Sequence, residues 1–221
     1  WRRVHGLEFE PFVGPVYNLH VQGDNSYVAE GIGVHNCVAH AWAAKVRAAP
    51  IMQQMTLPPY DFYRQIVAVD EFPDNDHEAT GPDFDLQSGT TVRAGAKTLV
   101  TLGYAKSYLW AESAEDVRAW ILAGFGGVVI GTRWDDNMMT PDADGFISPG
   151  GSSRGGHCTY LNGWSDRAKR GRKQVPASRG QNSWGDDWGQ KGRFWLSMED
   201  LDVLIKDGGE AAALTESRVV R

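Results

Sequence analysis

The pattern of apolar and polar positions changes abruptly at Cys37. Before it, residues 16–21 alternate between apolar and polar side chains, which predicts a strand, and residues 23–26 have the composition of a turn. From Cys37 onward, the segment CVAHAWAAKVRAA consists of strong helix formers and stops at Pro50. We therefore predict a β-hairpin within residues 1–36, a helix that begins at Cys37, and a domain boundary between them.

Later segments have the periodicity of short helices, and one of them carries a start signal. In residues 113–124, Ser113 can cap the helix and Asp116 completes a capping box. The last third of the chain instead contains short extended runs separated by glycine. Helices followed by strands predict an α+β fold for residues 37–221. The other predicted helices are residues 60–71 and 91–103, and the predicted strands are residues 126–134, 157–164, 180–185 and 192–198.

Three polar segments interrupt this pattern. Residues 70–85 and 133–145 are acidic but lack the complete oxygen-ligand spacing of a calcium loop, which favours solvated loops. Residues 166–179 are basic, and we expect a flexible surface insertion there. A partner site or a processing site in this insertion remains an alternative.

Composition limits the function classes. The chain has 221 residues, enough to bury a core in one or two domains, and its formal net charge of -6 argues against a nucleic-acid partner. No apolar run approaches the ~18 residues of a membrane span, and no signal peptide is recognisable, so we expect a cytoplasmic protein without a membrane partner. The two cysteines, Cys37 and Cys158, form neither a disulfide framework nor a paired-cysteine zinc spacing. We expect no metal and no cofactor.

The tripeptide His35-Asn36-Cys37 combines residue types that can break their own backbone. The side-chain nitrogen of Asn36 can attack its own carbonyl carbon and close a succinimide, and His35 can protonate the leaving amine. The thiol of Cys37 can accept an acyl group and pass it to the freed amine. The three residues therefore contain the chemistry for one end of an acyl rearrangement.

The surrounding segment, VYNLHVQGDNSYVAEGIGVHNC, closely resembles the C-terminal segment of inteins. The resemblance covers residues 1–36 and implies that Asn36 cyclises, that His35 assists, and that Cys37 is the first residue of the C-terminal extein. Position 1 is neither Cys nor Ser, and the chain contains no Thr-x-x-His motif. We therefore expect either the C-terminal partner of a split intein or a fragment of a longer precursor. The implied partner is an N-terminal intein half with its N-extein, in cis or in trans.

Cys37 also fits a second chemistry. A cysteine at the start of a helix has its thiolate favoured by the helix dipole, and a histidine from elsewhere in the fold can complete a nucleophilic pair. His157, which follows two glycines, and Asn182, which can orient an imidazole, are the candidates. Trp184 supplies a bulky apolar shield beside Asn182.

These strings strongly resemble the papain-like cysteine peptidases in three ordered motifs: a cysteine heading a helix, Gly-Gly-His, and Asn-Ser-Trp-Gly followed by Trp-Gly. The resemblance spans nearly all of residues 37–221 and implies a two-lobed fold, a helical lobe plus a β-rich lobe. It also implies that Cys37 is the nucleophile, His157 the general base and acid, and Asn182 its orienting partner, with Trp184 shielding their hydrogen bond. The implied substrate is a peptide or protein.

Other chemistry-bearing residues have structural interpretations. We expect Cys158 to be a buried strand thiol, and Trp188 and Trp195 to lie in the core. His40, one helical turn after Cys37, is expected to be a packed or exposed helix residue rather than a second base.

The two resemblances meet at Cys37. Papain-like enzymes carry a Gln shortly before the nucleophile that donates to the oxyanion, but here that position falls in the intein-like segment, and Gln22 lies in the wrong block. We therefore expect this Gln in the N-terminal extein, so that protein splicing assembles an active cysteine peptidase. Two alternatives stay open: an inactive papain-like binding module that carries an intein, and a related amidase or transferase on the same fold.

Overall fold

The computed structural model describes residues 28–29, 32–33, 37–57, 59–70 and 90–215. The helices are α1 (Cys37–Arg47), α2 (Pro59–Ala68), α3 (Val92–Thr101), α4 (Ala114–Leu122), the 3-10 turn η1 (Asp136–Met138) and α5 (Met198–Lys206). The strands are β1 (Val28–Ala29), β2 (Ile32–Gly33), β3 (Ser107–Trp110), β4 (Val128–Asp135), β5 (Phe146–Ile147), β6 (Ser153–Arg170), β7 (Lys173–Gln181), β8 (Arg193–Ser197) and β9 (Glu210–Thr215).

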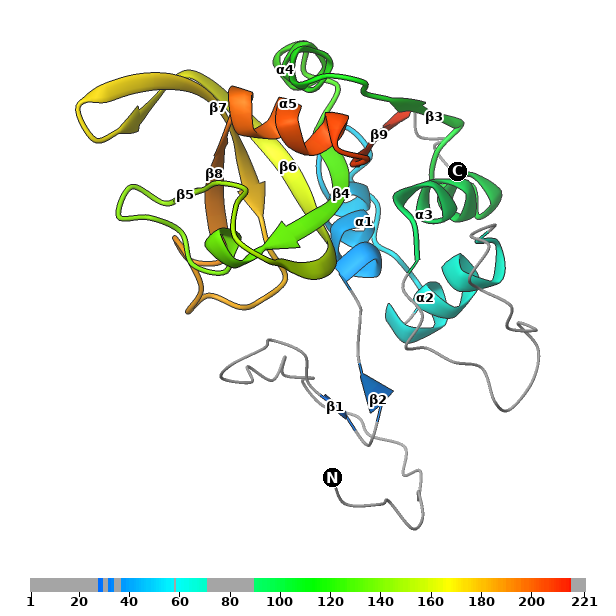
Figure 1. The fold of residues 1–221 in the computed structure, drawn as a ribbon. Coiled ribbons are helices and arrows are strands. Elements are labelled where there is room, and N and C mark those ends of the chain that lie inside the picture. Colours follow the sequence, from blue (N-terminus) through cyan, green and yellow to red (C-terminus); the bar gives the residue numbers. More distant parts are fainter. Residues whose placement is uncertain (1–27, 30–31, 34–36, 58, 71–89, 216–221) are drawn as a thin grey trace.

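A seven-stranded sheet in the order β3-β9-β4-β6-β7-β8-β5 organises the fold. Helices α1, α2 and α3 lie together on one side of it, and α5 lies across the other side (Figure 1). All paired neighbours run antiparallel except β5 and β8, which run parallel. The combination of helices and one large sheet confirms the predicted α+β class.

The core is divided by the sheet because successive strand residues point to opposite faces. Val129, Cys158 and Tyr160 are buried in one apolar cluster with residues of α1, α2 and α3. Val128 and Leu161 are buried in a second cluster with residues of α4 and α5. The central strands β4 and β6 therefore contribute to both clusters, and α1 is held directly against them.

Helix starts follow local chemistry closely. Helix α1 begins at Cys37, as predicted, although it ends at Arg47 rather than continuing to Pro50. At α4 the Ser113 hydroxyl accepts from the Asp116 N–H at 3.2 Å, and an Asp116 carboxylate oxygen accepts from the Glu112 N–H at 3.0 Å. The predicted cap of this helix is confirmed.

Two of the polar segments differ from the prediction. Residues 133–145 are not a wholly solvated loop, because β4 continues to Asp135, and the side chains of Asp135 and Met138 are buried. An Asp135 carboxylate oxygen accepts from the Gly150 N–H at 2.8 Å and lies 3.3 Å from Nε of Arg133, which explains how the charge is tolerated. The segment 70–85 lies outside the described residues after Asp70.

Residues 166–179 are not a flexible insertion but the paired ends of β6 and β7, with Arg170 opposite Lys173. Backbone hydrogen bonds hold this hairpin, while Ala168 and Ala177 point into a small apolar cluster. Arg170 also forms an ion pair with Asp142 at 3.1 Å. The basic side chains are therefore carried by a regular antiparallel pair of strands, β6 and β7.

Of the β-hairpin predicted within residues 1–36, the structure describes only residues 28–29 and 32–33. Strands β1 and β2 pair antiparallel, with Val28 opposite Gly33, but the predicted strand at residues 16–21 lies outside the described residues. The intein-like hairpin of residues 1–36 and the domain boundary at Asn36 stay predictions. Among the described residues, no helix is long and apolar enough to cross a membrane.

Candidate active site

Cys37 lies where α1 meets the central sheet. It is the first residue of the helix, and its half-buried side chain packs against the apolar cluster that contains Cys158 of β6. The backbone N–H groups of Cys158, Val38 and Cys37 itself lie near enough to the Cys37 sulfur to lower its pKa. The thiol therefore lies between the start of α1 and the backbone of β6.

Two effects oppose each other at this thiol. Enclosure by the protein raises the pKa of Cys37, because burial penalises the thiolate, and the three backbone N–H groups lower it. Burial is the larger effect. The sequence predicted a thiolate favoured by the helix start, whereas the structure indicates that the backbone donors alone do not outweigh burial. A nucleophile at Cys37 therefore needs a base.

The backbone of His157 lies near this thiol, since His157 immediately precedes Cys158, whose N–H acts on the sulfur. His157 lies on β6 directly opposite Thr132 of β4. Just before it the register of the two strands shifts, and Gly155 there has a φ of 110°, a conformation that favours glycine. The first glycine of the Gly-Gly pair noted in the sequence therefore lies in a bulge two residues before His157.

His157 and Asn182 are brought together although they are distant in sequence. Nε2 of His157 lies 2.8 Å from Oδ1 of Asn182. The same oxygen accepts from the Ser183 N–H at 2.8 Å, which identifies it as the amide oxygen. Because an amide oxygen can only accept, Nε2 carries a proton, and Nδ1 is the nitrogen that can exchange a proton with another group.

Asn182 is itself firmly positioned. It directly follows β7, its backbone N–H donates to the Gly192 carbonyl oxygen at 2.8 Å, and its side chain is 6% exposed. Burial strengthens the hydrogen bond to His157 because water does not compete for it. The arrangement fixes one edge of the imidazole.

Two tryptophans pack on the imidazole. The Trp184 ring lies 4.7 Å from the His157 ring, centroid to centroid, at an interplanar angle of 32°, as a shielding side chain would. The Trp134 ring, which sequence reasoning missed, lies at the same 4.7 Å but at 75°. Side-chain alternation along β4 relates the two residues: Trp134 lies two residues after Thr132, the strand partner of His157, so both side chains lie on the same face of the sheet as the imidazole.

The remaining sequence candidates are not gathered here. His35, Asn36 and Gln22 lie outside the described residues. His40 is exposed on α1. Cys158 is buried in a strand, as expected, and burial raises its pKa well above the ordinary value, with the neighbouring Cys37 adding to the shift. Within the described part of the chain, no three His, Cys, Asp or Glu side chains are grouped to hold a metal ion.

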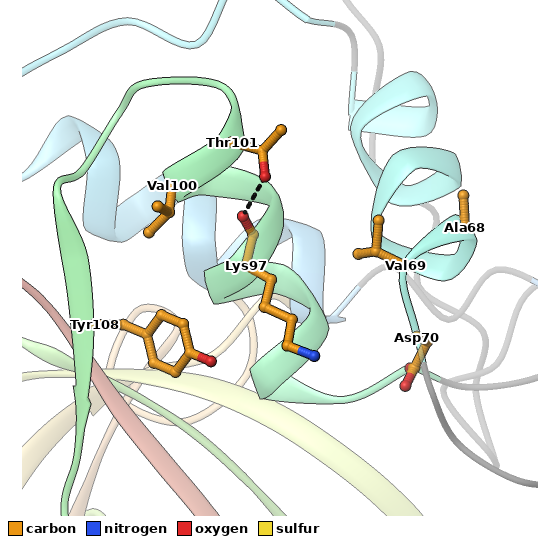
Figure 2. A pocket seen from close by; sticks show the side chains of 7 residues that line it. All are labelled: Ala68, Val69, Asp70, Lys97, Val100, Thr101 and Tyr108. Carbon is orange, nitrogen blue, oxygen red and sulfur yellow. Dashed lines mark hydrogen bonds between the residues drawn. The ribbon is translucent and has the colours of Figure 1, made fainter.

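An open pocket of about 560 Å³ lies elsewhere, beside α2, α3 and β3. Figure 2 shows its lining side chains, including Lys97 and Tyr108. The Asp70 carboxylate at its edge accepts hydrogen bonds from Thr90 and from Thr91 at the start of α3. None of the predicted site residues lines this pocket.

Comparison with protein-family models and with curated proteins gives no match. Among solved structures, the chain is similar to xylellain, a cysteine protease from Xylella fastidiosa, with a TM-score of 0.60 and 17% identity over 93% of this chain and 85% of that one. It is also similar to the bromelain protease from Ananas comosus in complex with the E64 inhibitor (TM-score 0.56, 11% identity, 82% and 89% coverage). A third similar structure is procathepsin B S9 from Trypanosoma congolense (TM-score 0.51, 12% identity, 81% and 67% coverage). The fold of this chain is therefore the papain-like cysteine protease fold.

Proposed function

We propose that the chain is a cysteine-type peptidase in which Cys37, His157 and Asn182 act together. The observation that carries the proposal is the 2.8 Å contact between Nε2 of His157 and Oδ1 of Asn182. The next residue after His157, Cys158, has its backbone N–H near enough to the Cys37 sulfur to lower its pKa. A half-buried thiol with a raised pKa needs a base, and the proposal assigns that role to the imidazole of His157.

The reaction follows from these groups. Nδ1 of His157 takes the Cys37 proton, and the sulfur attacks the carbonyl carbon of the scissile peptide bond. Backbone N–H groups at the start of α1 donate to the oxyanion that develops. His157 returns its proton to the leaving amine, which departs and leaves a thioester on Cys37. Water, activated by the now neutral imidazole, hydrolyses the thioester and restores the thiol.

The test compares peptide hydrolysis by three single variants on a mixture of fluorogenic peptides, with and without the N-terminal intein half. His157→Ala removes the base and should abolish turnover. Asn182→Ala should lower kcat about 10- to 100-fold, the value of a lost hydrogen bond to a group that becomes charged. His40→Ala is the matched control, because that histidine is exposed on the same helix as Cys37.

Two results would replace the proposal. If the unaltered chain binds peptides but releases no product even after the N-terminal intein half is supplied, the inactive binding module is the better account. If added free amines are joined to the acyl group faster than water, a transferase on the same fold is favoured. Full activity of His157→Ala would remove the imidazole from the mechanism.

We propose in addition that the bond between Asn36 and Cys37 breaks autocatalytically, and that splicing with an N-terminal intein half assembles the peptidase. This proposal rests on the tripeptide His35-Asn36-Cys37 and on the resemblance of residues 1–36 to inteins, and not on coordinates. In it Asn36 cyclises, His35 protonates the leaving amine, and Cys37 is the first residue of the C-terminal extein, to which the N-extein becomes joined.

Intact-mass measurement tests the splicing proposal separately from peptidase activity. With the N-terminal half supplied, the product should carry the N-extein joined to Cys37, and Asn36→Ala should prevent cleavage at this bond. His157→Ala should leave the junction chemistry unchanged. A chain that keeps its full mass, with or without the partner half, contradicts the proposal.

A further inference from the structure

Trp134 is the aromatic neighbour of His157 to which the reaction above gives no role. We propose that Trp134 is a positioning residue, which holds the imidazole of His157 in the orientation that directs Nδ1 toward the Cys37 thiol. The inference rests on the proposed peptidase function, because it concerns the same imidazole.

The place of Trp134 in the sheet is unusual. At Trp134 the register of β4 and β6 shifts, so that this one residue of β4 faces two residues of β6, one of which is Gly155. A bulge of this kind bends the strand and redirects nearby side chains. Two residues earlier, Thr132 pairs with His157, so Trp134 and His157 share a face of the sheet.

Three contacts together restrain the imidazole of His157. Trp184 covers it at an angle of 32°, Trp134 meets it at 75°, and Asn182 holds Nε2. Rotation of the ring about the bond that joins it to Cβ would bring it against the Trp134 indole. Removal of that indole takes away one of these three restraints and leaves the hydrogen bond to Asn182 and the stacking on Trp184.

Trp134 is rigid enough to act as a support. Its side chain is 3% exposed and lies within the apolar cluster of α4 and α5. Its ring meets the ring of Trp184 at 5.5 Å and 75°, and that of Phe194 at 6.3 Å and 84°. Aromatic pairs prefer edge-to-face contacts of this geometry. The indole of Trp134 is therefore buried and packed against other aromatic rings in a favourable arrangement.

A matched control exists in the same cluster. Trp188 is 7% exposed, its ring packs against Trp184 and Phe194, and its Nε1 donates to the Met139 carbonyl oxygen at 2.7 Å. Trp188→Leu and Trp134→Leu remove the same indole from the same core, so both should lose stability. A purely structural role for Trp134 predicts the same activity for both variants.

The experiment measures kcat and KM for Trp134→Leu, Trp134→Phe and Trp188→Leu in the full chain, each corrected for the folded fraction. We expect Trp134→Leu to lower kcat about 3- to 10-fold, the value of an aromatic contact, with KM unchanged. Trp134→Phe should recover most of the loss because a ring is retained, and Trp188→Leu should keep the kcat of the unaltered chain. If Trp134→Leu does not fold, Trp134→Met replaces it, since a thioether fills irregular space without a ring.

A second readout is independent of catalysis. The Nε2–H proton of His157, held by Asn182, should give a downfield proton resonance that weakens in Trp134→Leu and persists in Trp188→Leu. Equal kcat and equal resonances in the two variants would overturn the inference. If the unaltered chain hydrolyses no peptide but the resonance still depends on Trp134, the proposed function fails while the positioning role stands.

Discussion

The amine of Lys45 is the most informative place to test the electrostatics of this fold. Lys45 belongs to α1, its side chain is fully buried, and its Nζ lies 3.4 Å from the Phe125 carbonyl oxygen. Burial lowers its pKa from the ordinary 10.5 to about 8. That difference corresponds to about 3 kcal/mol of unfolding free energy that the charged amine costs the folded state.

The sign of the pH dependence follows from this lowered pKa. Below pH 8 both states are protonated and the full cost applies, and between pH 8 and 10.5 the unfolded chain binds more protons, so stability rises with pH. Lys45→Met removes the charge at similar volume. It should stabilise the protein at pH 7 by about 2 kcal/mol, once about 1 kcal/mol is deducted for the lost hydrogen bond.

Urea unfolding at a series of pH values from 6.5 to about 10.5 measures this effect. The advantage of Lys45→Met over the unaltered chain should shrink steadily above pH 8. Lys169→Met, at an exposed lysine on β6, is the control and should change stability little at any pH. A Lys45→Met protein that is less stable at pH 7, by an amount independent of pH, would show that the buried charge of Lys45 does not destabilise the folded state.

Three further predictions concern packing, thiol chemistry and capping. Gly95→Ala should destabilise the protein by about 1–3 kcal/mol in urea unfolding, because a Cβ there would lie 2.3 Å from Nε1 of the buried Trp42; an unchanged midpoint would contradict this close approach. Iodoacetamide should label Cys37 in the folded protein and Cys158 only after unfolding, since burial raises the Cys158 pKa well above its ordinary value; peptide mapping that finds Cys158 labelled first would be the opposite result. Ser113→Ala should cost about 1 kcal/mol by removing the cap of α4, and a change below the error of the unfolding measurement would argue against it.

The features that sequence reasoning predicted best depend on neighbours in the chain. Ser113 and Asp116 cap α4 because a hydroxyl and a carboxylate three residues apart satisfy free N–H groups wherever they occur. The start of α1 at Cys37 follows similarly from local helix propensity. His157 and Asn182 could be proposed from short motifs, but their 2.8 Å contact could not be measured from them.

The features that were missed depend on strand register, which is not local. The basic residues 166–179 suggested a loop, yet ladder hydrogen bonds are made by the backbone and tolerate charged side chains that face solvent. The role of Trp134 depends on which residue of β6 lies opposite β4, and on a bulge that shifts the pairing at that point. Alternation along β4 alone could not locate its neighbour across the sheet.

In the proposed mechanism His157 makes a nucleophile of the Cys37 thiol, whose own pKa is raised by burial. The rate of Cys37 alkylation by iodoacetamide at about pH 6, in the unaltered chain and in His157→Ala, measures this effect of the imidazole. We expect rapid alkylation of the unaltered chain and a rate at least about 100-fold lower in the variant, because a lone thiol whose pKa is raised by burial is almost fully protonated at that pH. Equal rates in the two proteins would contradict it.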